Sequence, residues 1–159
     1  KYIPPKKGRK HILYIIREML DFHPVSHRTD IGEAVAFFTR MMKRRTTAFV
    51  LSDFYDRRDF TKQMQIANSK HDLMAIQVYD RWARQLPDVG LMKIMDAETG
   101  RELYIDTGSR KVRQAHTRYW MEHEERLRET FSRSKVDWVS VATDEDYEKA
   151  MKQLFASRG

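Results

Sequence analysis

The sequence predicts an α/β domain built on a parallel sheet. Two apolar runs, at 47–51 and 73–78, are separated by a segment with helical character at about 57–70, which is the order of a β-α-β unit. A third apolar run at 136–141 is followed by an amphipathic segment at 147–155. Because the run at 47–51 is unbroken by polar residues, we expect it to be a central strand covered on both faces by helices.

Three more helices are predicted from the spacing of apolar residues. The first covers 12–20 and is expected to end near Pro24. The second is expected to begin at Asp30, which forms a capping-box pattern with Glu33, and to finish at 43–45. The third is a long helix at 110–132, with apolar and aromatic residues along one face.

Between the second and third strands the pattern changes to that of a hairpin. The segments 91–95 and 103–105 alternate, and residues 96–100 between them are turn-forming. The last helix is expected to follow a cap made by Thr143 and Asp144. No repeat, low-complexity segment or linker divides the chain, so we predict one domain over 1–159.

Composition excludes several classes of protein. The chain has 159 residues, of which 41% are hydrophobic, and it has no cysteine, so a disulfide framework, a thiolate zinc site and a cysteine nucleophile are all excluded. No apolar run approaches the roughly 18 residues of a membrane span, and we expect a cytoplasmic protein. The sequence also lacks the H-E-x-x-H, G-x-S-x-G, G-x-G-x-x-G and Walker patterns.

The net charge of +7 belongs to one half of the chain. Residues 1–79 carry 15 Lys and Arg against 8 Asp and Glu, whereas residues 80–159 carry 15 of each. A polyanionic partner is one interpretation. The other is a solvated surface with cations near helix C-termini, and we favour it because these clusters lack the interleaved aromatic residues of single-strand binding proteins.

Oxygen-bearing side chains converge on one edge of the predicted sheet. Asp53 follows the first strand, Asp80 follows the second, and Thr29 and Asp30 open the helix that leads into the first strand. Ligands of open α/β sheets bind at the carboxyl ends of the strands, and oxygen ligands suit Mg²⁺. For Asp30 and Asp80 we favour a role as caps or turn residues. For Asp53 the structural and the functional interpretation remain equally open.

Other candidate ligands do not form a set. The six histidines show no metal-ligand spacing, and His116 and His123 lie on the apolar stripe of the long helix, where we expect packed or half-exposed side chains. Tyr119, Trp120 and the nine methionines are interpreted as core residues.

Short motifs occur in order along nearly the whole chain, at 2–10, 28–31, 49–54, 71–73, 86–91, 96–100 and 143–147. Ser-Asp-Phe at 52–54 and Leu-Pro-x-x-Gly-Leu at 86–91 are the more specific ones. Together they resemble the bacterial family called domain of unknown function fifty-eight. That family is similar to von Willebrand factor A domains, which are doubly wound sheets with a metal-ion-dependent adhesion site, where Mg²⁺ is completed by an acidic residue of a protein partner.

The resemblance implies a von Willebrand factor A-like fold with a partial metal site. Thr29 corresponds to the site's threonine and Asp53 to its later aspartate, but the family's Asp-x-Ser-x-Ser segment does not occur. We therefore expect this chain to be the C-terminal part of such a domain, with the early strands before Lys1, and to hold Mg²⁺ poorly by itself. An exposed sheet edge would then favour self-association or a strand from another chain.

The function that the resemblance implies is a non-enzymatic protein–protein interaction module. Members of the family commonly accompany MoxR-type AAA ATPases, so a partner of that type, in protein assembly or maturation, is expected. The alternative is a metal-dependent nuclease or a nucleic-acid-binding domain that uses Asp53, Asp80 and the basic first half of the chain.

Overall fold

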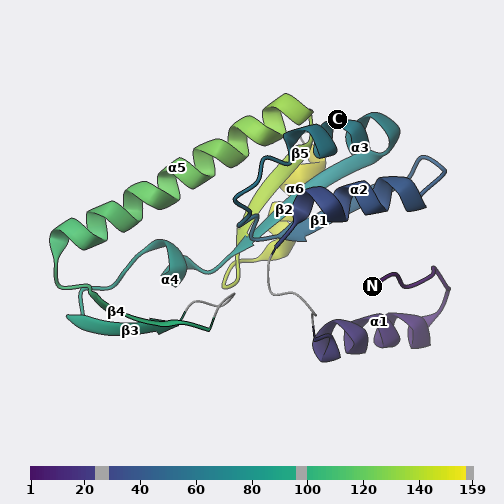
Figure 1. Ribbon diagram of the computed structural model, residues 1–159. Helices are drawn as coiled ribbons and strands as arrows, with labels where there is room; N and C mark the ends of the chain where they lie inside the picture. Colours follow the sequence, from purple (N-terminus) through teal and green to yellow (C-terminus); the bar gives the residue numbers. More distant parts are fainter. Residues whose placement is uncertain (24–28, 96–99, 157–159) are drawn as a thin grey trace.

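Strand β2 (Asp72–Tyr79) is the middle strand of a three-stranded parallel sheet in the computed structural model, which describes residues 1–23, 29–95 and 100–156. It pairs with β1 (Thr47–Ser52) on one side and with β5 (Asp137–Ala142) on the other (Figure 1). The predicted β-α-β unit and α/β class are therefore confirmed. The helices are α1 (Arg9–Asp21), α2 (Ile31–Met41), α3 (Thr61–Lys70), α4 (Arg81–Arg84), α5 (Arg110–Ser134) and α6 (Tyr147–Ala156).

The alternation of side chains along β2 builds two cores. Leu73 and Ala75 pack on one face with buried residues of α2, α3 and α5, whereas Met74 and Ile76 pack on the opposite face with α6. Successive strand residues point to opposite faces, so a run of uniformly apolar residues requires a cover on each side. The sheet is thus enclosed by three helices on one face and by α6 on the other (Figure 1).

Strand β1 differs from its prediction, because it lies at an edge of the sheet and is only half buried. Its pairing with β2 is its only pairing among the residues that the structure describes. The side chains of Phe49 and Leu51 are 41% and 63% exposed, although the ring of Phe49 lies 6.3 Å from that of Phe155 on α6. The prediction of a fully covered central strand holds for β2 instead. An apolar run indicates that a strand can be buried, but it does not indicate where the strand lies in the sheet.

Two helix starts also differ from prediction. Helix α3 begins at Thr61 and not near Arg57, because residues 53–60 form a loop in which Asp59 Oδ1 accepts a hydrogen bond of 2.9 Å from Thr61 N. Helix α6 begins at Tyr147, where Asp146 Oδ1 accepts from Glu148 N at 2.9 Å. Thr143 and Asp144 therefore do not cap this helix. By contrast, Asp30 caps α2 as expected, accepting from Glu33 N at 2.9 Å.

The predicted hairpin is confirmed as β3 (Leu91–Met95) and β4 (Glu102–Asp106), which pair antiparallel. Its predicted turn falls at 96–100, of which 96–99 lie outside the described residues. The buried hydroxyl of Thr107 closes the base of the hairpin, donating to the Gly90 carbonyl at 2.7 Å and accepting from Val89 N at 3.2 Å. The hairpin lies beside the N-terminal half of α5 (Figure 1).

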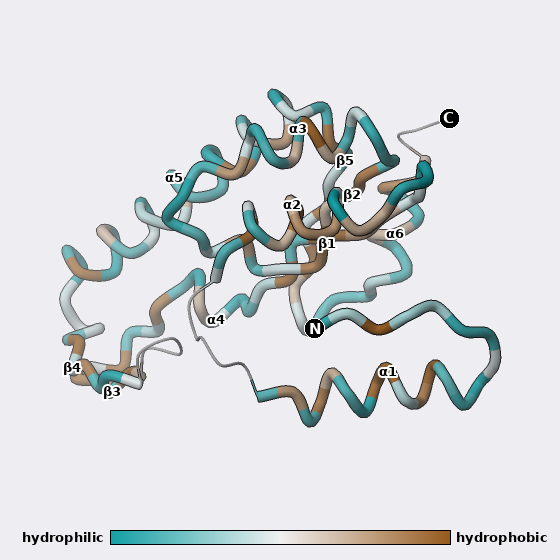
Figure 2. Tube along the Cα trace, turned by 45° about the vertical axis from the view of Figure 1, so that its right-hand side comes forward, coloured by the Kyte–Doolittle hydropathy of each residue, from teal (hydrophilic) through white to brown (hydrophobic). Residues whose placement is uncertain are grey.

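Helix α1 carries its apolar residues at helical spacing, as predicted, yet none of them is buried. It lies apart from the sheet in two views (Figures 1 and 2), and its apolar residues appear as brown stretches in Figure 2. Throughout the described ranges, no helix combines the length and the apolar composition that crossing a membrane requires.

Candidate ligand-binding edge of the sheet

The chain turns sharply where β1 ends. Phe54 has a φ of 56°, a left-handed conformation that bulky residues rarely adopt. Two hydrogen bonds between residues two positions apart hold the turn. Phe54 N donates to Ser52 Oγ at 3.0 Å, and Tyr55 N donates to Asp53 Oδ1 at 3.1 Å. The turn leaves the Asp53 side chain exposed at the carboxyl edge of the sheet.

The Phe54 side chain holds this turn in place. It is fully buried, and its ring lies 5.1 Å from that of Phe131 on α5 and 6.1 Å from that of Phe60. Aromatic burial of this extent contributes several kcal/mol, about 3–5 by the usual cost of Phe→Ala, which exceeds the roughly 1–2 kcal/mol cost of the left-handed backbone. The position of Asp53 is thus fixed by the core.

Asp56 joins the loop 53–58 to the start of α2. Its carboxylate, 2% exposed, accepts from Ile31 N at 2.9 Å and from Arg58 N at 3.0 Å. The Arg58 side chain in turn pairs with Asp30. Thr29 directly precedes Asp30, so Thr29 and Asp53 belong to two segments that these bonds tie together at one edge.

Asp80, the other carboxylate predicted for this edge, has a local structural role. Its Oδ1 accepts from Trp82 N at 2.9 Å and caps α4. The adjacent Arg81 pairs with Asp144 at 2.9 Å and with Glu145, which anchors the loop after β5. These two partners raise the pKa of the Arg81 guanidinium, chiefly through the hydrogen bond to Asp144. The favoured interpretation of Asp80 as a cap is confirmed.

Two further carboxylates at this edge, those of Asp30 and Asp56, are engaged within the chain. Both carboxylate oxygens of Asp30 and of Asp56 accept hydrogen bonds or pair with Arg58. Within the described ranges, no three His, Asp or Glu side chains gather at a geometry that could hold a metal. Thr29 and Asp53 would supply two ligands of the roughly six that a hard cation needs.

A polar network centred on Arg84 connects the sheet to α5. Arg84 Nη1 pairs with Glu124 on α5 at 2.7 Å, and Arg84 Nη2 donates to Gln77 Oε1 on β2 and to Ser140 Oγ on β5, each at 3.3 Å. The guanidinium also lies 3.2 Å from the centre of the Tyr79 ring, a cation–π contact. One side chain thus links two strands to α5.

Tyr119 and Trp120, which were predicted to be core residues, instead belong to an aromatic cluster between the loop 53–58 and α5. Tyr119 is 41% exposed, and its hydroxyl donates to the Tyr55 hydroxyl at 2.6 Å. Partial burial and this hydrogen bond raise the pKa of Tyr119 to about 12. The Trp120 ring lies 6.3 Å from that of Tyr55 and 5.6 Å from that of His123. The loop and helix therefore meet through aromatic and hydroxyl contacts.

The two histidines predicted to be packed lie within or beside this cluster. His123 is buried, and its Nε2 has no hydrogen-bond partner in the part of the chain that the structure describes. Burial lowers its pKa, and the charge of Arg126 lowers it further. His116 Nε2 accepts from Trp120 Nε1 at 3.2 Å, and burial lowers the pKa of His116 as well. Burial therefore favours the neutral form of both imidazoles.

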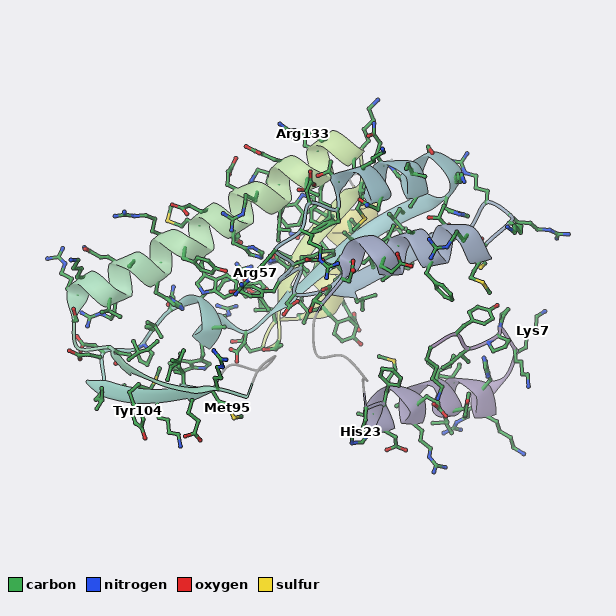
Figure 3. All side chains as sticks on the ribbon, viewed as in Figure 1. Lys7, His23, Arg57, Met95, Tyr104 and Arg133 are labelled. Carbon is green, nitrogen blue, oxygen red and sulfur yellow. The ribbon has the colours of Figure 1, made fainter. Side chains whose placement is uncertain are left out.

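A cavity of about 420 Å³ opens between the loop and α5, and we call it the basic pocket. It is lined by Tyr55, Asp56, Arg57, Tyr119, His123 and Arg126. Figure 3 shows Arg57 below the middle of α5, near the point where β2 leaves the sheet. The spacing of Tyr119, His123 and Arg126 places them on one helix face, but no pattern in the sequence indicated that Tyr55 and Arg57 would face them.

Comparison with known proteins finds relatives that are themselves uncharacterized proteins. The chain is 28% identical over 160 residues to uncharacterized proteins of Mycobacterium tuberculosis (strain ATCC 25618 / H37Rv) and Mycobacterium bovis, with 98% of this chain covered. It spans half the length of those relatives. An uncharacterized protein of Mycobacterium avium is 26% identical and is covered over 93% of its length. No solved structure matches significantly. Residues 1–126 match the family model described as protein of unknown function DUF58, and the chain belongs to that family.

Proposed function

We propose that this chain is a non-enzymatic protein-binding domain of the von Willebrand factor A-like type, whose partner contacts the loop 53–58 and the start of α2. The observation that carries the proposal is the strained turn at Phe54, which presents an exposed Asp53 at the carboxyl edge of the sheet. Backbone strain that the surrounding core maintains is characteristic of ligand-binding positions, and this edge is where α/β sheets bind ligands.

In this proposal Thr29 and Asp53 are two of the ligands of a Mg²⁺ ion, and the other ligands come from outside the described residues of this chain. The relatives of twice this length offer a source for them. The resemblance described above favours a MoxR-type AAA ATPase as the partner. The resemblance is the only support for this partner, so a binding assay with the purified ATPase must test the partnership separately.

Calorimetry of Mg²⁺ binding to the whole natural protein tests the metal assignment. We expect Asp53→Ala to weaken binding at least tenfold, because a charged ligand is lost. The matched control is Asp80→Asn, which alters a carboxylate at the same edge that is already engaged as a helix cap. Binding that is unchanged in Asp53→Ala, or equally weakened in the control, would contradict the assignment.

The alternative function is that of a metal-dependent nuclease or a nucleic-acid-binding domain, and the two arginines of the basic pocket, Arg57 and Arg126, are the observation that favours it. It predicts cleavage of a labelled oligonucleotide in Mg²⁺ or Mn²⁺ that is lost in Asp53→Ala. Binding without cleavage that falls steeply with salt would indicate nucleic-acid binding alone. Neither result is expected from a protein-binding domain.

A further inference from the structure

We infer that the basic pocket binds a carboxylate side chain of a protein partner without a metal ion. This inference rests on the proposed protein-binding function and assigns a second contact, separate from Thr29 and Asp53. The pocket combines a buried imidazole with two arginines at the junction of the loop 53–58 and α5.

The arginines of the pocket are available to an incoming anion. Neither Arg57 nor Arg126 forms an ion pair with any residue in the described ranges, and both side chains are exposed at the pocket. Arg58 next to them is paired with Asp30, and Asp56 is occupied by two backbone N–H groups. Two guanidinium groups therefore remain to form charge-assisted hydrogen bonds, for which their planar fork is suited to a carboxylate.

Buried polar groups in the wall also point to a ligand. His123 is 5% exposed and lines the pocket, and its Nε2 has no partner within the described part of the chain. Buried polar atoms in proteins are normally hydrogen-bonded, and in the tautomer with its proton on Nε2 the His123 imidazole would donate to a bound carboxylate. The Tyr55 hydroxyl, fixed by its bond to Tyr119, lies in the same wall.

Charge favours a carboxylate over a phosphate. The two arginines and Asp56 of the lining carry a net charge of +1, and a monoanion balances it. A dianionic phosphate would leave an excess of negative charge in the pocket. The rings of Tyr55 and Tyr119 offer apolar walls to the methylene groups of a glutamate.

The test is an NMR titration of the ¹⁵N-labelled chain, in EDTA, with a capped peptide of six glutamates. We expect shifts at Tyr55, Arg57 and His123, and binding weakened about tenfold by Arg57→Gln and by Arg126→Gln. The matched control is Arg128→Gln on the same helix, whose side chain is exposed and does not line the pocket. Binding that the two variants leave unchanged, or that the control loses equally, overturns the inference.

Further arms separate the possible anions and the two sites. A hexaglutamine peptide should cause no shifts, and inorganic phosphate or a single-stranded oligonucleotide that binds these residues more tightly than glutamate overturns the assignment to a carboxylate. If glutamate causes no shifts while Asp53→Ala still abolishes Mg²⁺-dependent partner binding, this inference fails and the proposed function stands. If glutamate binds at the pocket but Asp53→Ala leaves Mg²⁺-dependent partner binding unchanged, the proposed function fails instead.

Discussion

The backbone N–H of Ile31 donates a hydrogen bond of 2.9 Å to the carboxylate of Asp56, across 25 residues of sequence. This bond connects the first turn of α2 to the loop after β1, the two segments that carry Thr29 and Asp53. The side chain of Asp56 is almost completely buried, so the connection is shielded from water. The geometry of the candidate edge depends on it.

Replacing Asp56 should loosen this connection. Asp56→Ala leaves the N–H groups of Ile31 and Arg58 without their acceptor, and we expect the free energy of unfolding to fall by about 1–3 kcal/mol. Urea denaturation measures it. The control is Asp21→Ala, which removes an exposed i,i+4 ion pair with Arg17 and should cost less than about 0.5 kcal/mol. Equal losses in the two variants would contradict the role given to Asp56.

Backbone strain at Phe54 can be separated from its packing. Phe54→Ala should cost about 3–5 kcal/mol through the lost aromatic contacts. Phe54→Gly loses the same contacts but relieves the left-handed conformation, so it should be at least as stable as the alanine variant, by up to about 1 kcal/mol. A glycine variant clearly less stable than the alanine variant would show that the turn is unstrained.

The residue that follows α5 provides an independent test of the energetic cost of a left-handed backbone conformation. Lys135 follows the helix with a φ of 53°, and its N–H donates to the carbonyls of the last turn. This position is normally occupied by glycine, so Lys135→Gly should raise the free energy of unfolding by about 1 kcal/mol. Lys135→Ala controls for loss of the charge and should give no such gain.

The lowered pKa values of His116 and His123 should reduce the free energy of unfolding at acidic pH. Burial lowers the pKa of His116 and of His123 below the ordinary value of 6.5, so the unfolded chain binds these protons first as the pH falls. Stability is therefore unaffected by them above pH 6.5 and decreases as the pH drops from 6.5 towards their folded values.

Unfolding in urea at pH 7.5 and 5.5 measures this effect. The decrease should be smaller in a His116→Gln, His123→Gln double variant. NMR titration of the two imidazole rings gives the direct check, and midpoints at or above 6.5 would contradict the assigned burial.

The exposed edge of β1 should drive self-association of this chain. Leu51 is exposed on that strand, beside backbone groups that no other strand in the described ranges pairs on the outer side. A lysine on an edge strand opposes edge-to-edge pairing, so Leu51→Lys should shift the chain towards monomer in light-scattering measurements. Met19→Lys on the exposed face of α1 is the control, and an equal shift there would place the association elsewhere.

The sequence predicted most elements because their periodicities are local properties. The hairpin, the long helix and the cap at Asp30 follow from spacing within each segment. The parallel pairing of β1 with β2 follows from the order strand, helix, strand. The edge position of β1 could not be predicted in this way, because strand order depends on which strands are available to pair. The start of α3 was misplaced because the anchoring of residues 53–60 by Phe54 and Asp56 is a tertiary effect.

The candidate site was predicted only in part for the same reason. Asp53 was indicated because it directly follows an apolar strand, and that signal is local. The basic pocket joins Tyr55 and Arg57 to residues of α5 more than 60 positions away, and no spacing rule relates them. Tyr119 was assigned to the core because aromatic residues on a helix stripe are usually buried, whereas here the stripe extends past the sheet.

Hydrogen exchange of the whole natural protein, with and without a purified MoxR-type AAA ATPase in Mg²⁺ and ATP, tests the central claim most directly. If the carboxyl edge of the sheet is the binding surface, binding should slow exchange at 29–31 and 53–58, and Asp53→Ala should abolish that protection. Protection confined to the hairpin at 91–106 or to β1, or protection that Asp53→Ala leaves unchanged, would contradict it.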